Sequence, residues 1–227
     1  MRILVIAPHA DDESLGAGGA IARHVANGDD VTVALMTGPD EDGTHPFIDP
    51  AAFEKVRGEF HKALDVLGVE RRVVKNLPAV AMANSPVQIV NAAAKAVVEE
   101  ARPERLYVPF AFDLHKDHRE LFYAFAVQWR AYLPTGQAIR EVLAYETPSE
   151  THLAAPYVEP SFTPNVFIDV SAHLDKKLAA LACYESQRQD PPLPRSPQAI
   201  EALARLRGSQ IGVDAAEAFV LVRRLET

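Results

Sequence analysis

The chain has few of the features that mark disulfide-stapled, membrane-spanning or nucleic-acid-binding proteins. Of its 227 residues only Cys183 is a cysteine, which excludes a disulfide within the chain and a multi-cysteine zinc site. Lysine and arginine number 23 against 31 acids, and a net charge of -8 argues against DNA or RNA as the main partner, although local basic pockets are still allowed. The apolar stretch at residues 2–8 is too short for a signal-peptide core or a membrane span. We therefore expect a cytoplasmic protein with no membrane span, in which any metal is held by histidine and carboxylate.

The bulk composition is that of an ordinary globular protein. Apolar residues make up 48% and charged residues 24% of the chain, so neither disorder nor a fibrous repeat is indicated. A chain of this length can bury a substantial core and lies within the range of one α/β domain. We predict a single domain that covers residues 1–227.

Apolar periodicity predicts strands and helices in alternation. Strands are expected at 2–7, 30–36, 71–75 and 105–109, and helices at 13–26, 51–67, 87–101 and 117–131. After residue 140 the pattern predicts strands at 141–146, 165–170 and 218–222 and helices at 172–187 and 198–207. This alternation is typical of an α/β fold, a Rossmann-like three-layer sandwich whose central sheet is mostly parallel. Loops 37–50 and 147–164 are long for a compact domain, which is typical of lids or substrate walls.

Two clusters of acids and imidazoles stand just past predicted strands. His9-Ala-Asp11-Asp12-Glu13 follows the first strand, and Asp113-Leu-His115-Lys-Asp117-His118 follows the strand at 105–109. Ligands of parallel sheets bind at the carboxyl ends of strands, so residues a hundred positions apart can meet there. His9 and Asp12 from the first cluster and His118 from the second make three ligands, the number in a catalytic zinc site that keeps a fourth position open for water.

The remaining side chains of the clusters suit acid–base chemistry. Asp11, left off the metal, can take the proton of a water molecule that the metal activates. His115 can stabilise an oxyanion as an imidazolium and protonate a leaving nitrogen, and Asp117 can orient one of the imidazoles. The plainer alternatives are that Asp11 to Glu13 merely cap a helix and that the second cluster is a solvated polar loop.

The order of these motifs resembles that of the zinc-dependent PIG-L/LmbE-type deacetylases, which remove acetyl groups from N-acetylglucosamine-containing compounds. The hallmark His-Pro-Asp-Asp-Glu stands here as His9-Ala-Asp11-Asp12-Glu13, and His-x-Asp-His stands as His115-Lys-Asp117-His118. Ala10 departs from the usual proline, which fixes turn geometry but carries no chemistry. The resemblance implies zinc on His9, Asp12 and His118, Asp11 as base, and His115 as oxyanion stabiliser and acid. It also implies that Arg57 binds substrate hydroxyls. The alternative role for Arg57 is an ion pair on the helix surface.

The sequence thus predicts a metal-dependent hydrolase of an acetamide, with Zn²⁺ or, in a cell short of zinc, Fe²⁺ as the ion. Its substrate would be a small N-acetylated sugar or a related amide, and related enzymes often assemble, so a homo-oligomer is a further expectation. Two rivals are a dinuclear hydrolase of the metallo-β-lactamase type and a non-catalytic, Rossmann-like sugar- or nucleotide-binding protein.

Overall fold

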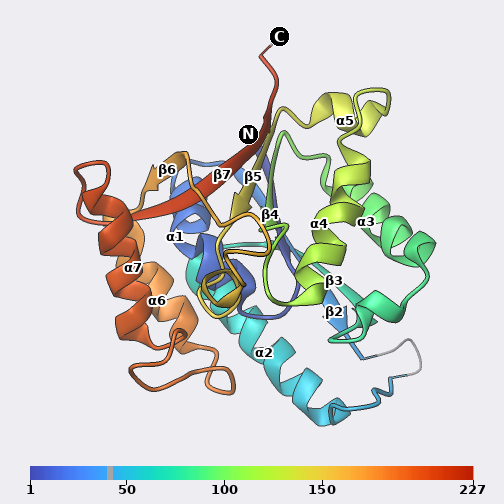
Figure 1. The fold of residues 1–227 in the computed structure, drawn as a ribbon, viewed down its shortest axis with the longest axis horizontal. Helices are drawn as coiled ribbons and strands as arrows, with labels where there is room; N and C mark the ends of the chain where they lie inside the picture. The colour runs from blue at the N-terminus through green and yellow to red at the C-terminus, as the bar shows by residue number, and fades with distance from the viewer. Residues whose placement is uncertain (40–42, 227) are drawn as a thin grey trace.

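The computed structural model describes residues 1–39 and 43–226, and within these ranges seven strands form one sheet. The order across the sheet is β3-β2-β1-β4-β5-β7-β6 (Figure 1). Strands β1 to β5 run parallel, and β7 runs antiparallel to both β5 and β6. The strands are β1 (Arg2–Ala7), β2 (Asp30–Gly38), β3 (Arg71–Pro78), β4 (Arg105–Pro109), β5 (Glu141–Tyr145), β6 (Val166–Asp169) and β7 (Ala216–Arg224).

Helices cover both faces of the sheet, so the predicted three-layer α/β fold is confirmed. Figure 1 shows α3, α4 and α5 on one side and α1, α6 and α7 on the other. The helices are α1 (Asp12–Ala26), α2 (Pro50–Leu67), α3 (Val87–Ala101), α4 (Lys116–Gln128), α5 (Pro134–Ala138), α6 (Leu174–Ala182) and α7 (Pro197–Ser209). None of the helices in the described ranges is both long and apolar enough to cross a bilayer.

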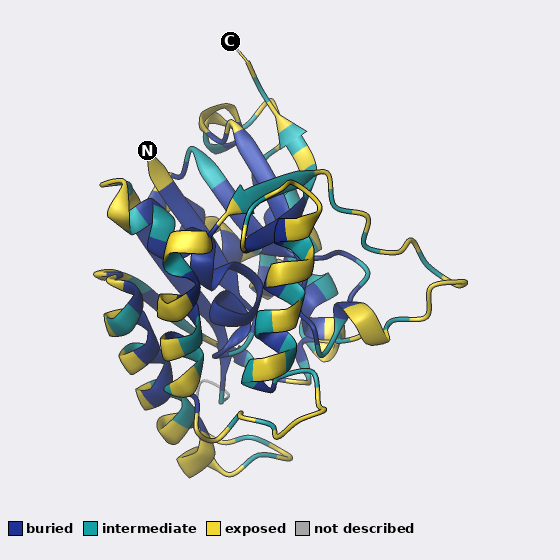
Figure 2. Ribbon diagram, turned by 90° about the vertical axis from the view of Figure 1, so that its left-hand side faces the viewer, coloured by how far each residue is buried: buried dark blue, intermediate teal, exposed yellow. Residues whose placement is uncertain are grey.

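Strand β1 supplies side chains to both layers of the core. Successive side chains of a strand point to opposite faces. Ile3 and Val5 therefore belong to the cluster under α1 and α2, whereas Leu4 and Ile6 belong to the cluster under α3 and α4. A strand buried on both faces has a continuous run of apolar residues, as residues 3–7 do. Figure 2 shows the interior strands as buried.

The pairing of β1 with β4 brings the two polar clusters together. These strands are parallel neighbours, with Ile3 opposite Arg105 and Val5 opposite Tyr107. Their carboxyl ends therefore lie at the same edge of the sheet, and α1 and α4 begin close to those ends. The predicted meeting of segments about a hundred residues apart follows from this one strand pair.

Helix α1 is held against the sheet by small residues and by a buried ion pair. A side chain at Gly16 would place its Cβ 2.2 Å from a ring carbon of Tyr145, so only glycine allows this approach. Lys177 Nζ donates to the Leu15 carbonyl at 2.8 Å, and the Glu217 carboxylate accepts from two backbone amides of α1 at 2.8 and 2.7 Å. Lys177 and Glu217 also pair with each other at 2.5 Å. These contacts fix the helix whose first turn carries Asp12.

Several boundaries differ from those expected. Helix α5 was not predicted, α4 ends at Gln128 rather than 131, and α6 ends at Ala182 rather than 187. The long loop at 147–164 contains a short 3-10 helix, Thr151–Leu153. Of the other long loop, 37–50, residues 40–42 lie outside the described ranges.

Candidate metal centre and active site

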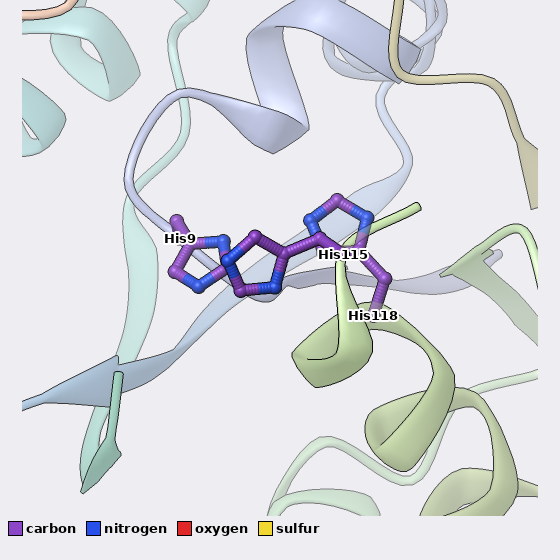
Figure 3. A group of neighbouring side chains, drawn as sticks. All are labelled: His9, His115 and His118. Carbon is purple, nitrogen blue, oxygen red and sulfur yellow. The ribbon is translucent and has the colours of Figure 1, made fainter. Parts of the chain in front are cut away.

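Three donor atoms from the two clusters converge at the edge of the sheet. His9 lies in the turn between β1 and α1, Asp12 is the first residue of α1, and His118 lies in the first turn of α4. Asp12 Oδ2 is 3.3 Å from His9 Nδ1 and 3.2 Å from His118 Nε2. Ring nitrogens of His9, His115 and His118 all lie within 4.8 Å of one another (Figure 3).

Carboxylates behind the imidazoles set which ring nitrogens carry protons. His9 Nε2 donates to Asp117 Oδ2 at 3.0 Å, and His118 Nδ1 donates to Asp113 Oδ2 at 2.8 Å. Asp113 is fully buried and accepts a second hydrogen bond from the Thr151 hydroxyl at 2.5 Å. In the neutral imidazoles these hydrogen bonds keep the ring proton on the outer nitrogen, so His9 Nδ1 and His118 Nε2, which face Asp12, are the nitrogens that a metal ion would take in place of a proton. In metal sites, a carboxylate that accepts the proton of the other ring nitrogen orients a histidine ligand in this way.

The donor set fits a divalent ion. Neighbouring ligands of a tetrahedral ion with bonds of about 2.0–2.2 Å lie about 3.3–3.6 Å apart, close to both Asp12 distances. Burial would lower the pKa of His9, but the hydrogen bonds to Asp117 and Asp12 raise it to about 9. Burial likewise would lower the pKa of His118, but Asp12 and Asp113 raise it to about 10. An environment that stabilises cationic imidazoles so strongly also favours a metal cation, which competes with protons for the same lone pairs.

Asp11 is buried beside the donor set in a strained backbone conformation. Its φ of 128° lies in the region that favours glycine, and such strain is often found at functional sites. Its side chain makes no capping hydrogen bond to α1, so the capping alternative does not describe it. Burial and the neighbouring Asp12 carboxylate hold the pKa of Asp11 well above its usual value. Arg195 Nη1 lies 3.3 Å from Asp11 Oδ2.

Glu13, the last acid of the first cluster, has a structural role. Its carboxylate is fully buried and accepts hydrogen bonds from the hydroxyls of Ser14 at 2.6 Å and Tyr184 at 2.5 Å. Burial raises the pKa of Glu13 to about 6. These contacts tie the start of α1 to the segment that follows α6.

His115 is a neutral imidazole that caps α4. Its Nδ1 accepts a hydrogen bond from the backbone amide of Asp117 at 3.2 Å, which places the ring proton on Nε2. Burial and the positive charge of His9 lower the pKa of His115 to about 4. The side chain is therefore a hydrogen-bond donor at neutral pH, whereas the sequence led us to expect an imidazolium.

The converging residues line one cavity of about 270 Å³. Asp11, Asp12 and the three histidines lie on its wall together with an apolar strip from α2 and the preceding loop. Arg57 lines the cavity too and donates to the Asn76 side chain at 2.8 Å. Its ion pair with Glu54 is long, at 3.7 Å, and that carboxylate is largely exposed. Asp117 does not line the cavity and contacts His9 from behind. The strip from α2 and its loop consists of Ile48, Ala52, Phe53 and Val56.

The structure adds residues to which the sequence assigned no role. The sequence showed Asp113 only as a member of the second cluster. Thr151 and Arg195 gave no sequence signal, because Thr151 lies 38 residues from Asp113 and Arg195 lies 184 residues from Asp11. The histidines that a dinuclear site would require lie elsewhere: His152 pairs with Glu146 at 2.8 Å, and His173 directly precedes α6.

Sequence similarity identifies the family to which the chain is related. The sequence model of the family described as PIG-L, GlcNAc-PI de-N-acetylase, matches residues 4–129, which are more than half of the chain and include both clusters. The chain belongs to the PIG-L family. A diacetylchitobiose deacetylase from Thermococcus kodakarensis is 27% identical over 194 residues, or 82% of this chain and 70% of that protein.

Solved structures confirm the PIG-L fold over the whole chain. A conserved protein from Thermus thermophilus superposes with a TM-score of 0.72 at 27% identity, covering 100% of this chain and 97% of the other. A 4-carboxy-2-hydroxymuconate hydratase from Pseudomonas putida gives 0.76 at 21% identity, with 100% and 98% coverage. N,N'-diacetylchitobiose deacetylase from Pyrococcus horikoshii gives 0.73 at 20% identity, with 97% and 83% coverage. Because this fold carries deacetylases and a hydratase, activity has to be argued from the site.

Proposed function

We propose that this chain is a zinc-dependent deacetylase that hydrolyses the acetamide of an N-acetylglucosamine-containing or related N-acyl compound to a free amine and acetate. The observation that carries this proposal is the convergence of His9, Asp12 and His118 in a cavity that Asp11 and His115 also line. The PIG-L family description and the diacetylchitobiose deacetylase relative support the same chemistry.

In this proposal His9, Asp12 and His118 hold the ion, with zinc as the first choice and ferrous iron as the other ion that such ligands accept. When bound, the ion supplies a Lewis acid and lowers the pKa of a water molecule toward neutrality. Asp117 positions the His9 ring through its 3.0 Å hydrogen bond, and Asp113 positions His118 at 2.8 Å. A rigid donor set of this kind keeps the attacking water and the substrate in reach of the remaining groups.

Asp11 moves the proton in this scheme. Its raised pKa lets the carboxylate take a proton from the attacking water and hold it while the oxygen bonds to the acyl carbon. Asp11 then delivers that proton to the amide nitrogen as the carbon–nitrogen bond breaks. His115 Nε2–H donates to the carbonyl oxygen as negative charge develops there. A neutral His115 is suited to donating this hydrogen bond rather than to protonating the amine, so the acid role passes to Asp11.

Arg57 is the proposed substrate contact in the outer cavity, where its guanidinium faces the sugar hydroxyls while Asn76 holds it in place. An arginine on the cavity wall can donate several hydrogen bonds in a fixed fork. This assignment places the acetamide at the inner end, near Asp11, and the rest of the substrate along α2.

Amine release from N-acetylglucosamine and diacetylchitobiose, followed with an amine-reactive dye on metal-loaded protein, tests the proposal. We expect turnover by wild type and a loss of about 10²- to 10⁴-fold in kcat for Asp11→Asn, because a general base contributes about that much. Asp65→Asn, an exposed acid on α2, is the matched control and should retain full activity. An Asp11→Asn variant with undiminished turnover would remove the base assignment, and a metal-loaded wild type inactive on every N-acetylated amine would remove the proposed function.

A further inference from the structure

Arg195 is short of hydrogen-bond partners for an arginine on a cavity wall. Arg119, in comparison, grips both oxygens of Glu159 at 2.5 and 2.6 Å. Arg195 makes a single contact of 3.3 Å from Nη1 to Asp11, and its Nε is buried with no acceptor in the described ranges. A guanidinium has five N–H donors, and a buried donor without an acceptor is unfavourable. The unused donors beside Asp11 therefore indicate a ligand that brings oxygen atoms.

A second guanidinium on the same cavity is also incompletely paired. Arg57 Nη2 donates to Asn76, but its Nε is likewise buried with no acceptor in the described residues. Arg57 and Arg195 come from different walls, one from α2 and the other from the segment before α7, and both line the 270 Å³ cavity.

The carboxyl groups of the cavity leave the two guanidinium groups incompletely paired. Asp12 is occupied by the imidazoles of His9 and His118, and Asp11 faces Arg195 through one long contact only. Glu150, the remaining acid on the wall, makes no ion pair with either arginine among the described residues, and burial raises its pKa. Two incompletely paired guanidinium groups thus line this cavity, although the chain has a net charge of -8.

We propose, resting on the proposed function, that the amine part of the substrate carries a carboxylate or phosphate group, which Arg195 binds next to the scissile amide. The planar fork of a guanidinium matches the paired oxygens of these groups, and such charge-assisted bonds are stronger than bonds to hydroxyls. The backbone around Arg195 is already fixed, because its amide donates to Gln189 Oε1 at 3.0 Å and Ser196 caps α7. Arg195 is thereby a specificity residue for an anionic N-acyl compound.

The test compares three substrates that differ only in the group on the anomeric carbon, which adjoins the carbon that bears the acetamide: methyl N-acetylglucosaminide, carboxymethyl N-acetylglucosaminide and N-acetylglucosamine 1-phosphate. We expect metal-loaded wild type to prefer one of the anionic compounds by kcat/KM, which also tells carboxylate from phosphate. Arg195→Gln should lose about 10- to 100-fold on that compound, the usual effect of removing a hydrogen bond to a charged group, and change little on the neutral one. Arg205→Gln, the same charge change on an exposed residue of α7 that pairs with Glu201, should behave as wild type.

A binding measurement separates this inference from the proposed function. Calorimetric titration of metal-free protein with glucosamine 1-phosphate, or with carboxymethyl glucosaminide, should show binding by wild type and Arg205→Gln and weakened binding by Arg195→Gln. Equal losses of Arg195→Gln on all three substrates would mean that Arg195 serves Asp11 rather than the substrate and would overturn the inference. A wild type that prefers the neutral compound would overturn it too. Wild type inactive on all three substrates contradicts the proposed function, while the titration still decides the role of Arg195.

Discussion

Asp113 offers the sharpest test of how the outer carboxylates hold the metal ligands. It is fully buried, accepts the Nδ1–H of His118 at 2.8 Å and accepts the Thr151 hydroxyl at 2.5 Å. In Asp113→Asn the side-chain carbonyl can still accept the His118 proton, so the ring orientation survives, whereas the negative charge and the oxygen that accepts the Thr151 hydroxyl are lost. In Asp113→Ala the acceptor is lost as well, and the His118 N–H is left buried without a partner.

The two substitutions should therefore weaken zinc binding by different amounts. Loss of an outer-shell partner costs about 10- to 100-fold in metal affinity, or about 1.4–2.7 kcal/mol. We expect the loss of zinc affinity to be about 10-fold for Asp113→Asn and about 100-fold for Asp113→Ala. Competition with a chromogenic chelator at fixed pH measures the zinc affinity, and thermal unfolding checks that both variants fold. The control variant is Asp175→Asn, on the exposed side of α6. Zinc affinity within about twofold of wild type in both variants would refute the argument that Asp113 supports a metal-bound His118.

Two further predictions concern the anchoring of α1. Lys177→Met should destabilise the fold by about 3–5 kcal/mol, because it leaves the buried Glu217 carboxylate without its partner, whereas Lys176→Met on the exposed side of α6 should have little effect on chemical denaturation. An unfolding free energy unchanged in Lys177→Met would show that the pair contributes nothing. Gly16→Ala should cost about 1–3 kcal/mol through overlap with the Tyr145 ring, while Gly58→Ala, with open space around its Cβ, should stabilise α2 by about 0.5–1 kcal/mol. Similar melting temperatures for the two glycine variants would contradict the close approach of α1.

The convergence of the two clusters was predictable because it depends on one strand pair. The apolar runs that form β1 and β4 each end in a group of acids and imidazoles, and parallel neighbours place such ends at one edge. The spacing of three residues between His9 and Asp12 and the helix that begins after His115 also follow from local signals. The fold class was predictable for the same reason, since alternation of strands and helices sets the layers.

What could not be predicted depends on contacts between distant segments. Nothing near Asp11 in the sequence indicates Arg195, and nothing near Asp113 indicates Thr151. The neutral state of His115 follows from burial and from the positive charge of His9, neither of which residue type reveals. Helix α5 has only five residues, too few to show a period, and α6 stops before Tyr184, whose hydroxyl turns inward to Glu13.

The central claim is that His9, Asp12 and His118 form one metal site, and the metal content of purified protein tests it most directly. Elemental analysis would give the metal content of wild type, His118→Ala and the control His61→Ala, whose histidine lies on α2 outside the site. Each protein would be measured as purified without added metal and again after incubation with zinc or ferrous iron. We predict about one ion per chain in wild type and His61→Ala and none in His118→Ala, the stoichiometry of a mononuclear site. A wild type that takes up no ion, or a His118→Ala variant that binds as much as wild type, would contradict the account, and about two ions per chain would favour a dinuclear centre.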